Sequence, residues 1–358
     1  MSNFIDKSRK REEALKAYGF YNDLQKCFSF GSGHINDTFC LELTDKKYIL
    51  QRINHDIFTE PEKVMANIEG VTNFLKKKGV LTLNIIKTLD GKNLFKDSIG
   101  SYWRVYDFIS GARTYDIIED ENLMLEAGVA FGNFQKQLAD YPAETLCETI
   151  PDFHNTPLRL KTLKKAIESD TKSRADIVKE EIDFILSKEY IASFMIDLLD
   201  KKSLPLRVTL NDTKINNVMI DEKTGKSVCV IDLDTVMSGL IANDFGEAVR
   251  IGCSTSAEDE TDLNKIKFNM DYYKAFAKGF MSISRENLSE LEIETLPMGA
   301  KLMTYENAIR FLTDYLLGDV YFKIHRENHN LERCKAQLQL FKEIENVYDE
   351  LVMIVKAY

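Results

Sequence analysis

The chain has 358 residues, of which 44% are hydrophobic, so it can bury a sizeable core and is long enough for two lobes with a cleft between them. Its 47 basic and 57 acidic residues leave a net charge of -10, which argues against a nucleic acid as its partner. No apolar run approaches the roughly 18 residues that a membrane span needs, and the charged N-terminus is not typical of a signal peptide, so we expect a cytoplasmic protein without a membrane partner.

The first third of the chain is predicted to be mostly β-structure. From Cys27 to about Ile109, short apolar segments alternate with turn sequences, and hairpins are expected around the TDKK turn and around Asp90-Gly91. The segment 61–79 is an exception, because its apolar residues recur at helical spacing and a glycine follows them. These patterns predict a small β-rich lobe with one helix.

The periodicity changes after the apolar segment YWRVYDFISG. Long segments with helical periodicity follow, and a short β island at Pro205–Leu233 interrupts them. This order of elements predicts an α+β, protein-kinase-like bilobal fold with a larger helical C-terminal lobe. The predicted parts are a nucleotide-binding lobe (residues 1–108), a hinge (near Val105–Gly111) and a catalytic and substrate-binding lobe (residues 109–358).

The β island carries the residue types that phosphoryl transfer needs, namely a carboxylate that orients the attacking hydroxyl and oxygen ligands for Mg²⁺. In LNDTKINN, Asp212 is the candidate that accepts the hydroxyl proton, and Asn217 is a neutral oxygen ligand. The apolar segment SVCVIDLD ends with Asp232 and Asp234, which strand alternation would place on one side as metal ligands. Each of these features also occurs by chance or in turns, so only their combination favours a phosphotransferase site.

A second aspartate motif needs a separate interpretation, because Asp244, Phe245 and Gly246 spell the DFG of protein kinases. In protein kinases the metal-binding aspartate ends a hydrophobic strand soon after the catalytic loop, and Asp232 has that context. We therefore assign the metal to Asp232 and expect Asp244 to brace the catalytic loop.

These motifs resemble those of the aminoglycoside phosphotransferase and choline kinase superfamily, and within it the bacterial N-acetylhexosamine 1-kinases. The similar segments, in order from about residue 20 to 345, are FGSGHINDTF, YILQRIN, WRVYDFI, LRVTLNDTKINNVMIDEKTG, VIDLDTVM, RFLTDYLLGDVYF and HNLERCKAQ. The resemblance implies ATP- and Mg²⁺-dependent phosphorylation of the anomeric hydroxyl of N-acetylglucosamine or N-acetylgalactosamine. It implies that Asp212 is the catalytic aspartate and that Asn217 and Asp232 bind magnesium.

The resemblance also assigns the acceptor site. It implies that His34, Arg310 and Tyr321, together with Asp212, contact the hydroxyl and acetamido groups of the sugar. From the residues alone, His34 is better explained as a turn residue, and Arg310 fits an ion pair that stabilises the lobe equally well.

The nucleotide is expected against the β-rich lobe. The predicted contacts are Gly31, Ser32, Gly33, Gln51, Tyr106 and Phe108. The glycine-containing loop can present backbone N–H groups to phosphates, although it lacks the G-x-G-x-x-G pattern. In the superfamily that the chain resembles, a lysine usually holds the phosphates at the position of Gln51, which carries no charge. Glu69 on the predicted helix is a candidate partner for this region or a solvated helix residue.

A second departure from the superfamily is Leu210, which stands where a histidine usually precedes the catalytic aspartate and removes one side-chain hydrogen bond. Two alternatives therefore stay open. The same fold could phosphorylate an amino alcohol, an aminoglycoside or another alcohol, or it could be a nucleotide-binding pseudokinase. The expected partners are ATP and a small sugar, and the protein is expected to be a monomer or a weak homo-oligomer.

Overall fold

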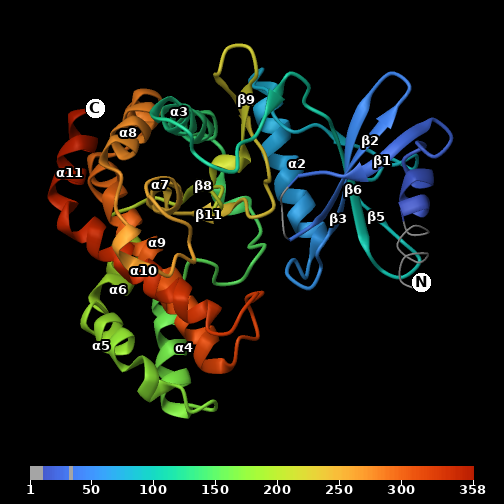
Figure 1. Ribbon diagram of the computed structural model, residues 1–358. Helices are drawn as coiled ribbons and strands as arrows, with labels where there is room; N and C mark the ends of the chain where they lie inside the picture. Colours follow the sequence, from blue (N-terminus) through green and yellow to red (C-terminus); the bar gives the residue numbers. More distant parts are fainter. Residues whose placement is uncertain (1–10, 32–34) are drawn as a thin grey trace.

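The computed structural model describes residues 11–31 and 35–358. A β-rich N-terminal region lies to the right in Figure 1, and a larger helical C-terminal region lies to the left. This arrangement is the kinase-like α+β fold that the sequence predicts. We propose that the boundary between the two lobes lies at residues 108/109, just after the last strand of the N-terminal sheet.

An antiparallel sheet forms the N-terminal region, with the strand order β1-β2-β3-β6-β4 and with β5 also paired to β6. Its strands are β1 (Leu24–Ser29), β2 (Asp37–Leu43), β3 (Lys47–Ile53), β4 (Ile85–Ile86), β5 (Phe95–Lys96) and β6 (Tyr102–Asp107). Helix α2 (Pro61–Lys77) buries apolar residues at helical spacing in a core that it shares with Ile53 of β3 and Tyr106 of β6. The predicted helix of this lobe is therefore confirmed.

The turn at Asp90-Gly91 differs from its prediction. The turn itself forms, since the backbone N–H of Thr88 donates to the carbonyl of Lys92 over 2.8 Å and Gly91 has φ +82°. Its flanking strands β4 and β5, however, pair with β6 and not with each other. The prediction of a simple hairpin was wrong because the longer, largely buried strand β6 offers both short segments a better partner than they offer one another.

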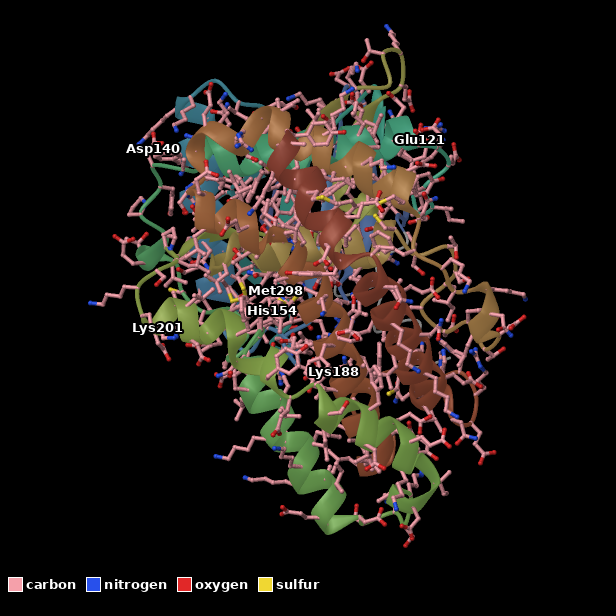
Figure 2. All side chains as sticks on the ribbon, turned by 90° about the vertical axis from the view of Figure 1, so that its left-hand side faces the viewer. Glu121, Asp140, His154, Lys188, Lys201 and Met298 are labelled. Carbon is pink, nitrogen blue, oxygen red and sulfur yellow. The ribbon has the colours of Figure 1, made fainter. Side chains whose placement is uncertain are left out.

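Helices dominate the C-terminal region. They are α3 (Glu121–Gln137), α4 (Thr156–Ser169), α5 (Lys179–Ser187), α6 (Tyr190–Asp200), α7 (Ile241–Gly252), α8 (Met270–Ser284), α9 (Glu290–Leu317), α10 (His329–Asn346) and α11 (Tyr348–Ala357). Helix α9 is buried along most of its length and packs against α7, α10 and α4. Its contact with α7 is backbone to backbone, because a Cβ on Gly246 would lie 2.1 Å from the carbonyl carbon of Gly299. Figure 2 shows Asp140 and Lys201 reaching outward at the rim of this region.

The predicted β island lies among these helices and forms two small sheets. One has the order β10-β9-β7 and the other pairs β11 with β8. The strands are β7 (Ala112–Arg113), β8 (Arg207–Thr209), β9 (Val218–Asp221), β10 (Ser227–Val230) and β11 (Met237–Gly239). Two loops connect them: the Asp212 loop (residues 210–217) joins β8 to β9, and the Asp232 loop (residues 231–236) joins β10 to β11. Among the described residues, no helix is long and apolar enough to cross a membrane.

Candidate active site

Hydrogen bonds to the N-terminal part of α7 fix the position of the Asp212 loop. The carboxylate of Asp244 accepts hydrogen bonds from the backbone N–H groups of Leu210 (2.8 Å) and Asn211 (2.7 Å). The hydroxyl of Thr213 donates to the backbone carbonyl of Asp244 over 2.6 Å. Burial raises the pKa of Asp244 to about 6, and the two backbone donors limit this rise. The expectation that Asp244 braces the loop is therefore confirmed.

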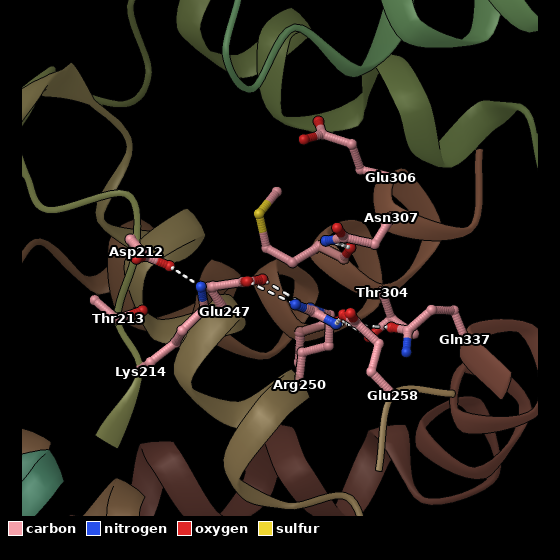
Figure 3. A network of polar contacts seen from close by, with 12 residues as sticks. Asp212, Thr213, Lys214, Glu247, Arg250, Glu258, Thr304, Glu306, Asn307 and Gln337 are labelled. Carbon is pink, nitrogen blue, oxygen red and sulfur yellow. Dashed lines mark hydrogen bonds and ion pairs between the residues drawn. The ribbon is translucent and has the colours of Figure 1, made fainter. Parts of the chain in front are cut away.

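Asp212 lies at the open side of this loop and is in contact with two of its neighbours. The ammonium group of Lys214 lies 2.7 Å from Oδ1 of Asp212, a contact that Figure 3 also shows. The side-chain amide of Asn217 donates to the backbone carbonyl of Asp212 over 2.7 Å and lies 3.3 Å from its Oδ2. The D-x-x-x-x-N spacing thus brings both side chains together, and the amide oxygen of Asn217 receives no hydrogen bond from any described residue.

The two aspartates of the Asp232 loop have different surroundings. Asp232 is exposed and makes no hydrogen bond or ion pair with a described residue. Asp234 is buried, and both of its oxygens face donors of the N-terminal lobe: Arg104 Nη1 lies 2.5 Å from Oδ1, and Asn36 Nδ2 donates to Oδ2 over 2.7 Å. The predicted strand alternation of the two carboxylates is wrong, because β10 ends at Val230 and Asp232 adopts a left-handed conformation (φ +57°).

Asp232 is consequently the carboxylate of this loop that is open to a cation. Although the side chain of Asp232 reaches solvent, the surrounding protein desolvates its carboxylate in part and raises its pKa to about 7, and the carboxylates of Asp234 and Asp212 add to this effect. A bound cation would relieve this repulsion. In the described part of the chain, no cluster of three or more His, Cys, Asp or Glu side chains could hold a metal alone. An ion held by Asp232 and Asn217 would need nucleotide phosphates and water as further ligands, which is usual for Mg²⁺.

The two loops are joined directly to each other. The hydroxyl of Thr235 donates to the backbone carbonyl of Leu210 over 2.7 Å, and the side-chain amide of Asn211 donates to the carbonyl of Thr235 over 2.8 Å. Leu210 itself is fully buried in the core. This link, which the sequence analysis missed, connects the loops without the histidine that Leu210 replaces.

The nucleotide side of the site is partly outside the described residues. Ser32, Gly33 and His34 fall in the undescribed segment 32–34, so the structure does not place them. Gly31 precedes them with φ +79°, a conformation that favours glycine. Close to it, the ring of Phe108 lies 5.6 Å from that of Phe30 in an edge-on contact, which brings the hinge segment and the glycine-containing loop together.

Gln51 has a fixed orientation on β3. Its amide nitrogen donates to the hydroxyl of Thr38 over 3.0 Å, and its amide oxygen accepts two hydrogen bonds from Arg104 (2.8 and 3.0 Å). The side chain of Tyr106 is buried beside Arg104, whose guanidinium lies 5.2 Å from the centre of the ring. Glu69 does not pair with β3: it binds Lys87 and Asn93 and lines a groove of about 600 Å³ between α2 and residues 90–96.

The predicted acceptor residues Arg310 and Tyr321 lie close together near the C-terminal half of α9. The guanidinium of Arg310 lies 5.3 Å from the ring centre of Phe322 and 6.0 Å from that of Tyr321, and it forms no hydrogen bond or ion pair with a described residue. The alternative role in a lobe-stabilising ion pair is therefore not seen here. Asp314 holds the exposed Tyr321 in place, because its carboxylate accepts the backbone N–H groups of residues 320–322.

Sequence analysis missed two residues beside Arg310. Nδ1 of His154 lies 2.9 Å from the carboxylate of Glu306, which also accepts a hydrogen bond from Thr156. Burial disfavours the charged imidazole, but the Glu306 carboxylate raises the pKa of His154 above its usual value. Nε2 of His154 is buried without a hydrogen-bond partner among the described residues. A signal existed, since Glu306, Arg310 and Asp314 recur every four residues and therefore share one face of the C-terminal half of α9.

Glu247 of α7 connects the acceptor side electrostatically to the Asp212 loop. It forms a buried ion pair with Arg250 over 2.7 Å. Burial opposes its ionisation, but the positive charges of Arg250, Lys214 and His154 lower the pKa of Glu247 to about 2. Figure 3 shows Glu247 between Lys214 and Arg250 in this network.

The fold is similar to those of several solved small-molecule kinases. A microcompartment-associated aminopropanol kinase is 13% identical, with a TM-score of 0.60 over 95% of this chain and 97% of that chain. An amicoumacin kinase, solved with AMP-PNP, Ca²⁺ and Ami, is 12% identical, with a TM-score of 0.61 over 96% of each chain. A choline kinase from Cryptosporidium parvum Iowa II is 13% identical, with a TM-score of 0.58 over 97% of each chain. At these identities the likeness concerns the fold alone.

The sequence comparison covers the nucleotide side and both loops of the β island, whereas Arg310 and Tyr321 lie beyond the matched segment. Residues 28–274 match the family described as "Phosphotransferase enzyme family". The matched segment is more than half of the chain and contains both loops of the β island, together with the N-terminal sheet from the end of β1 onwards. The chain therefore belongs to the phosphotransferase enzyme family.

Proposed function

We propose that the protein is an ATP- and Mg²⁺-dependent kinase that phosphorylates the anomeric hydroxyl of N-acetylhexosamines. The observation that carries this proposal is the arrangement of Asp212 beside Lys214 and Asn217 in a braced loop. The neighbouring loop adds Asp232 as an open carboxylate. The amicoumacin kinase of the same fold was solved with AMP-PNP and Ca²⁺, which supports a nucleotide and a divalent cation as ligands here.

In the proposed reaction, Asp212 orients the acceptor hydroxyl and accepts its proton while the hydroxyl oxygen attacks the γ-phosphorus of ATP; the bond from the γ-phosphorus to the β,γ-bridging oxygen breaks and ADP leaves. Asn217 restrains the backbone at Asp212 through a hydrogen bond to its carbonyl, and its amide also contacts the carboxylate. Lys214 places a positive charge beside Asp212, close to where the phosphoryl group is transferred to the acceptor oxygen. Bound Mg²⁺, held by Asp232 and Asn217, would neutralise charge on the nucleotide phosphates. Positioning and charge neutralisation would thus supply most of the rate enhancement.

The charges near α9 favour a neutral sugar over a cationic amino alcohol. The carboxylate of Glu306 is occupied by His154 and Thr156, and that of Asp314 by backbone N–H groups and Asn330. Arg310, in contrast, is a positive charge without a described ionic partner. An ammonium group would meet this charge while both of these α9 carboxylates are occupied, whereas the carbonyl of an acetamido group can accept a hydrogen bond from Arg310.

The proposal is tested by measuring ADP release with Mg²⁺-ATP and a panel of acceptors: N-acetylglucosamine, N-acetylgalactosamine, glucose, choline and 1-amino-2-propanol. Phosphorus NMR then identifies an anomeric phosphate in any product. We expect turnover with the N-acetylhexosamines and a loss of at least ~10²-fold in kcat for Asp212→Asn, with little change in ATP affinity. Asp183→Asn is the matched control, because this exposed carboxylate lies on α5 away from the site.

The alternatives give different results in the same assay. Turnover with choline or 1-amino-2-propanol alone would refute the sugar as acceptor and leave the roles of the Asp212 and Asp232 loops intact. Tight ATP binding without turnover of any acceptor would instead identify a pseudokinase.

A further inference from the structure

Arg104 occupies an unusual place between the nucleotide side and the Asp232 loop. It is the cross-strand partner of Gln51 in the β3–β6 pairing, and its side chain is only 1% exposed. Its guanidinium donates two hydrogen bonds to the amide oxygen of Gln51. A buried guanidinium needs an anionic partner, because taking it out of water is costly.

The anionic partner of Arg104 comes from the other lobe. Nη1 of Arg104 lies 2.5 Å from Oδ1 of Asp234, although Asp234 is 130 positions further along the chain. Helix α2 of its own lobe offers only the sulfur of Met65, at 3.9 Å. The guanidinium therefore bridges the N-terminal sheet and the loop that presents Asp232.

Electrostatics explains why a cation is needed at this position. A nucleotide polyphosphate between the lobes would approach the carboxylates of Asp212, Asp232 and Asp234, and such like charges repel one another. Strand β3 supplies no unpaired positive charge beside the Asp232 loop, since Gln51 is neutral, Arg52 is paired with Asp37, and Lys47 at the start of the strand is paired with Glu42. Lys214 belongs to the Asp212 loop of the other lobe and is paired with Asp212. Of the cations located above, Arg104 is the one that faces the Asp232 loop from the sheet.

We propose that Arg104 is a positioning residue for the nucleotide phosphates, which supplies from β6 the positive charge that β3 lacks. It acts through Gln51 and Asp234, which its guanidinium holds, and through its charge, without touching the phosphates. The inference rests on the proposed function in so far as the nucleotide binds between the two lobes. Its consequence is that Arg104 determines the affinity for the phosphates of a nucleotide and leaves the affinity for the nucleoside unchanged.

The test compares the binding of ADP and of adenosine by calorimetry or ligand-observed NMR, with and without Mg²⁺. Arg104→Met alone would leave the Asp234 carboxylate buried without its partner, which destabilises the fold. The informative comparison is therefore between Asp234→Asn and the double variant that carries Asp234→Asn and Arg104→Met, because the two proteins differ only at Arg104. The double variant should bind ADP at least ~10-fold more weakly than Asp234→Asn does, while the Kd for adenosine changes less than ~2-fold.

A control and a rescue complete the experiment. The control is Arg174→Met, which removes a different, partly buried ion pair with Asp319. This variant should lower the melting temperature without changing the affinity for ADP. Gln51→Lys, added to the double variant, returns a cation to β3 and should recover most of the lost ADP affinity. An ADP affinity of the double variant equal to that of Asp234→Asn would overturn the proposal, because Arg104 would then only neutralise Asp234. An equal loss for ADP and adenosine would overturn it too.

The use of binding separates this inference from the proposed function. A protein that binds ADP but phosphorylates no N-acetylhexosamine would refute the proposed reaction, while the comparison of ADP with adenosine would still decide the role of Arg104.

Discussion

The link between the two loops can be tested by replacing Thr235 with valine, which removes the hydroxyl and keeps the shape of the side chain. The hydroxyl is buried and donates to the carbonyl of Leu210 over 2.7 Å. A hydrogen bond of this kind contributes about 1 kcal/mol net, and leaving the buried carbonyl without it costs about 1–3 kcal/mol. We therefore expect the free energy of unfolding to fall by about 2 kcal/mol.

Activity should respond as well, because Leu210 lies two residues before Asp212 and the bond fixes the distance between the two loops. Displacing a reacting group by about 1 Å can cost about 10²-fold in rate, so a partial displacement should lower kcat by about 10-fold. Melting temperature and kcat are measured at saturating ATP and acceptor. Thr72→Val is the matched control, since that buried hydroxyl also donates to a backbone carbonyl, but within α2. If Thr235→Val lost stability with kcat unchanged, the link would be structural only, and our account of the loop without its histidine would be wrong.

Three further predictions concern single charges. Asp232→Asn should raise the Mg²⁺ concentration for half-maximal activity at least ~10-fold, because it removes a proposed oxygen ligand. Its thermal stability should be equal or higher, because desolvation and then the nearby carboxylates raise the pKa of Asp232 and so disfavour its charged form; an unchanged Mg²⁺ requirement would refute the metal assignment. Arg310→Gln should raise the KM for the acceptor about 10–100-fold, which is the contribution of one charged hydrogen bond, without changing the KM for ATP; an unchanged acceptor KM would exclude Arg310 from the acceptor site. The pKa of Glu247 is lowered from 4.5 to about 2, so its ion pair should contribute stability above pH 4.5 that is lost as the pH falls towards 2. The difference in melting temperature between the unchanged protein and Glu247→Gln should therefore shrink over this range. A constant difference would contradict the lowered pKa.

The sequence predicted those parts of the site in which the interacting residues are neighbours in the chain. Asp212 and Asn217 are five residues apart in a loop between two short strands, and the structure joins them through a hydrogen bond of 2.7 Å. Asp244 could be separated from the metal site because an apolar strand precedes Asp232 and a further turn precedes Asp244. In both cases the short stretch of chain between the residues allows few backbone conformations, so their relative positions can be predicted from the sequence.

The prediction failed where a local rule was carried past the end of its element. The alternation of Asp232 and Asp234 assumed that the strand continues, whereas β10 ends at Val230 and the chain turns at Asp232 with a positive φ. An aspartate can adopt this conformation at a moderate cost, and nothing in the pattern IDLD signals it. The turn has a functional consequence, because it leaves Asp232 open to a cation and buries Asp234 against Arg104.

The acceptor side shows a different limit, which follows from the length of chain between its residues. His154 and Glu306 are 152 positions apart, and a single sequence carries no signal for that pairing. The spacing of Glu306, Arg310 and Asp314 on α9 does show that charged groups enter an apolar core, and burying each of them requires a partner. The structure supplies such partners for Glu306 and Asp314 but not for Arg310 among the described residues. The charge that the fold leaves unpaired is therefore the one that we expect the acceptor to pair with, and this is why the choice between a sugar and an amino alcohol depends on Arg310.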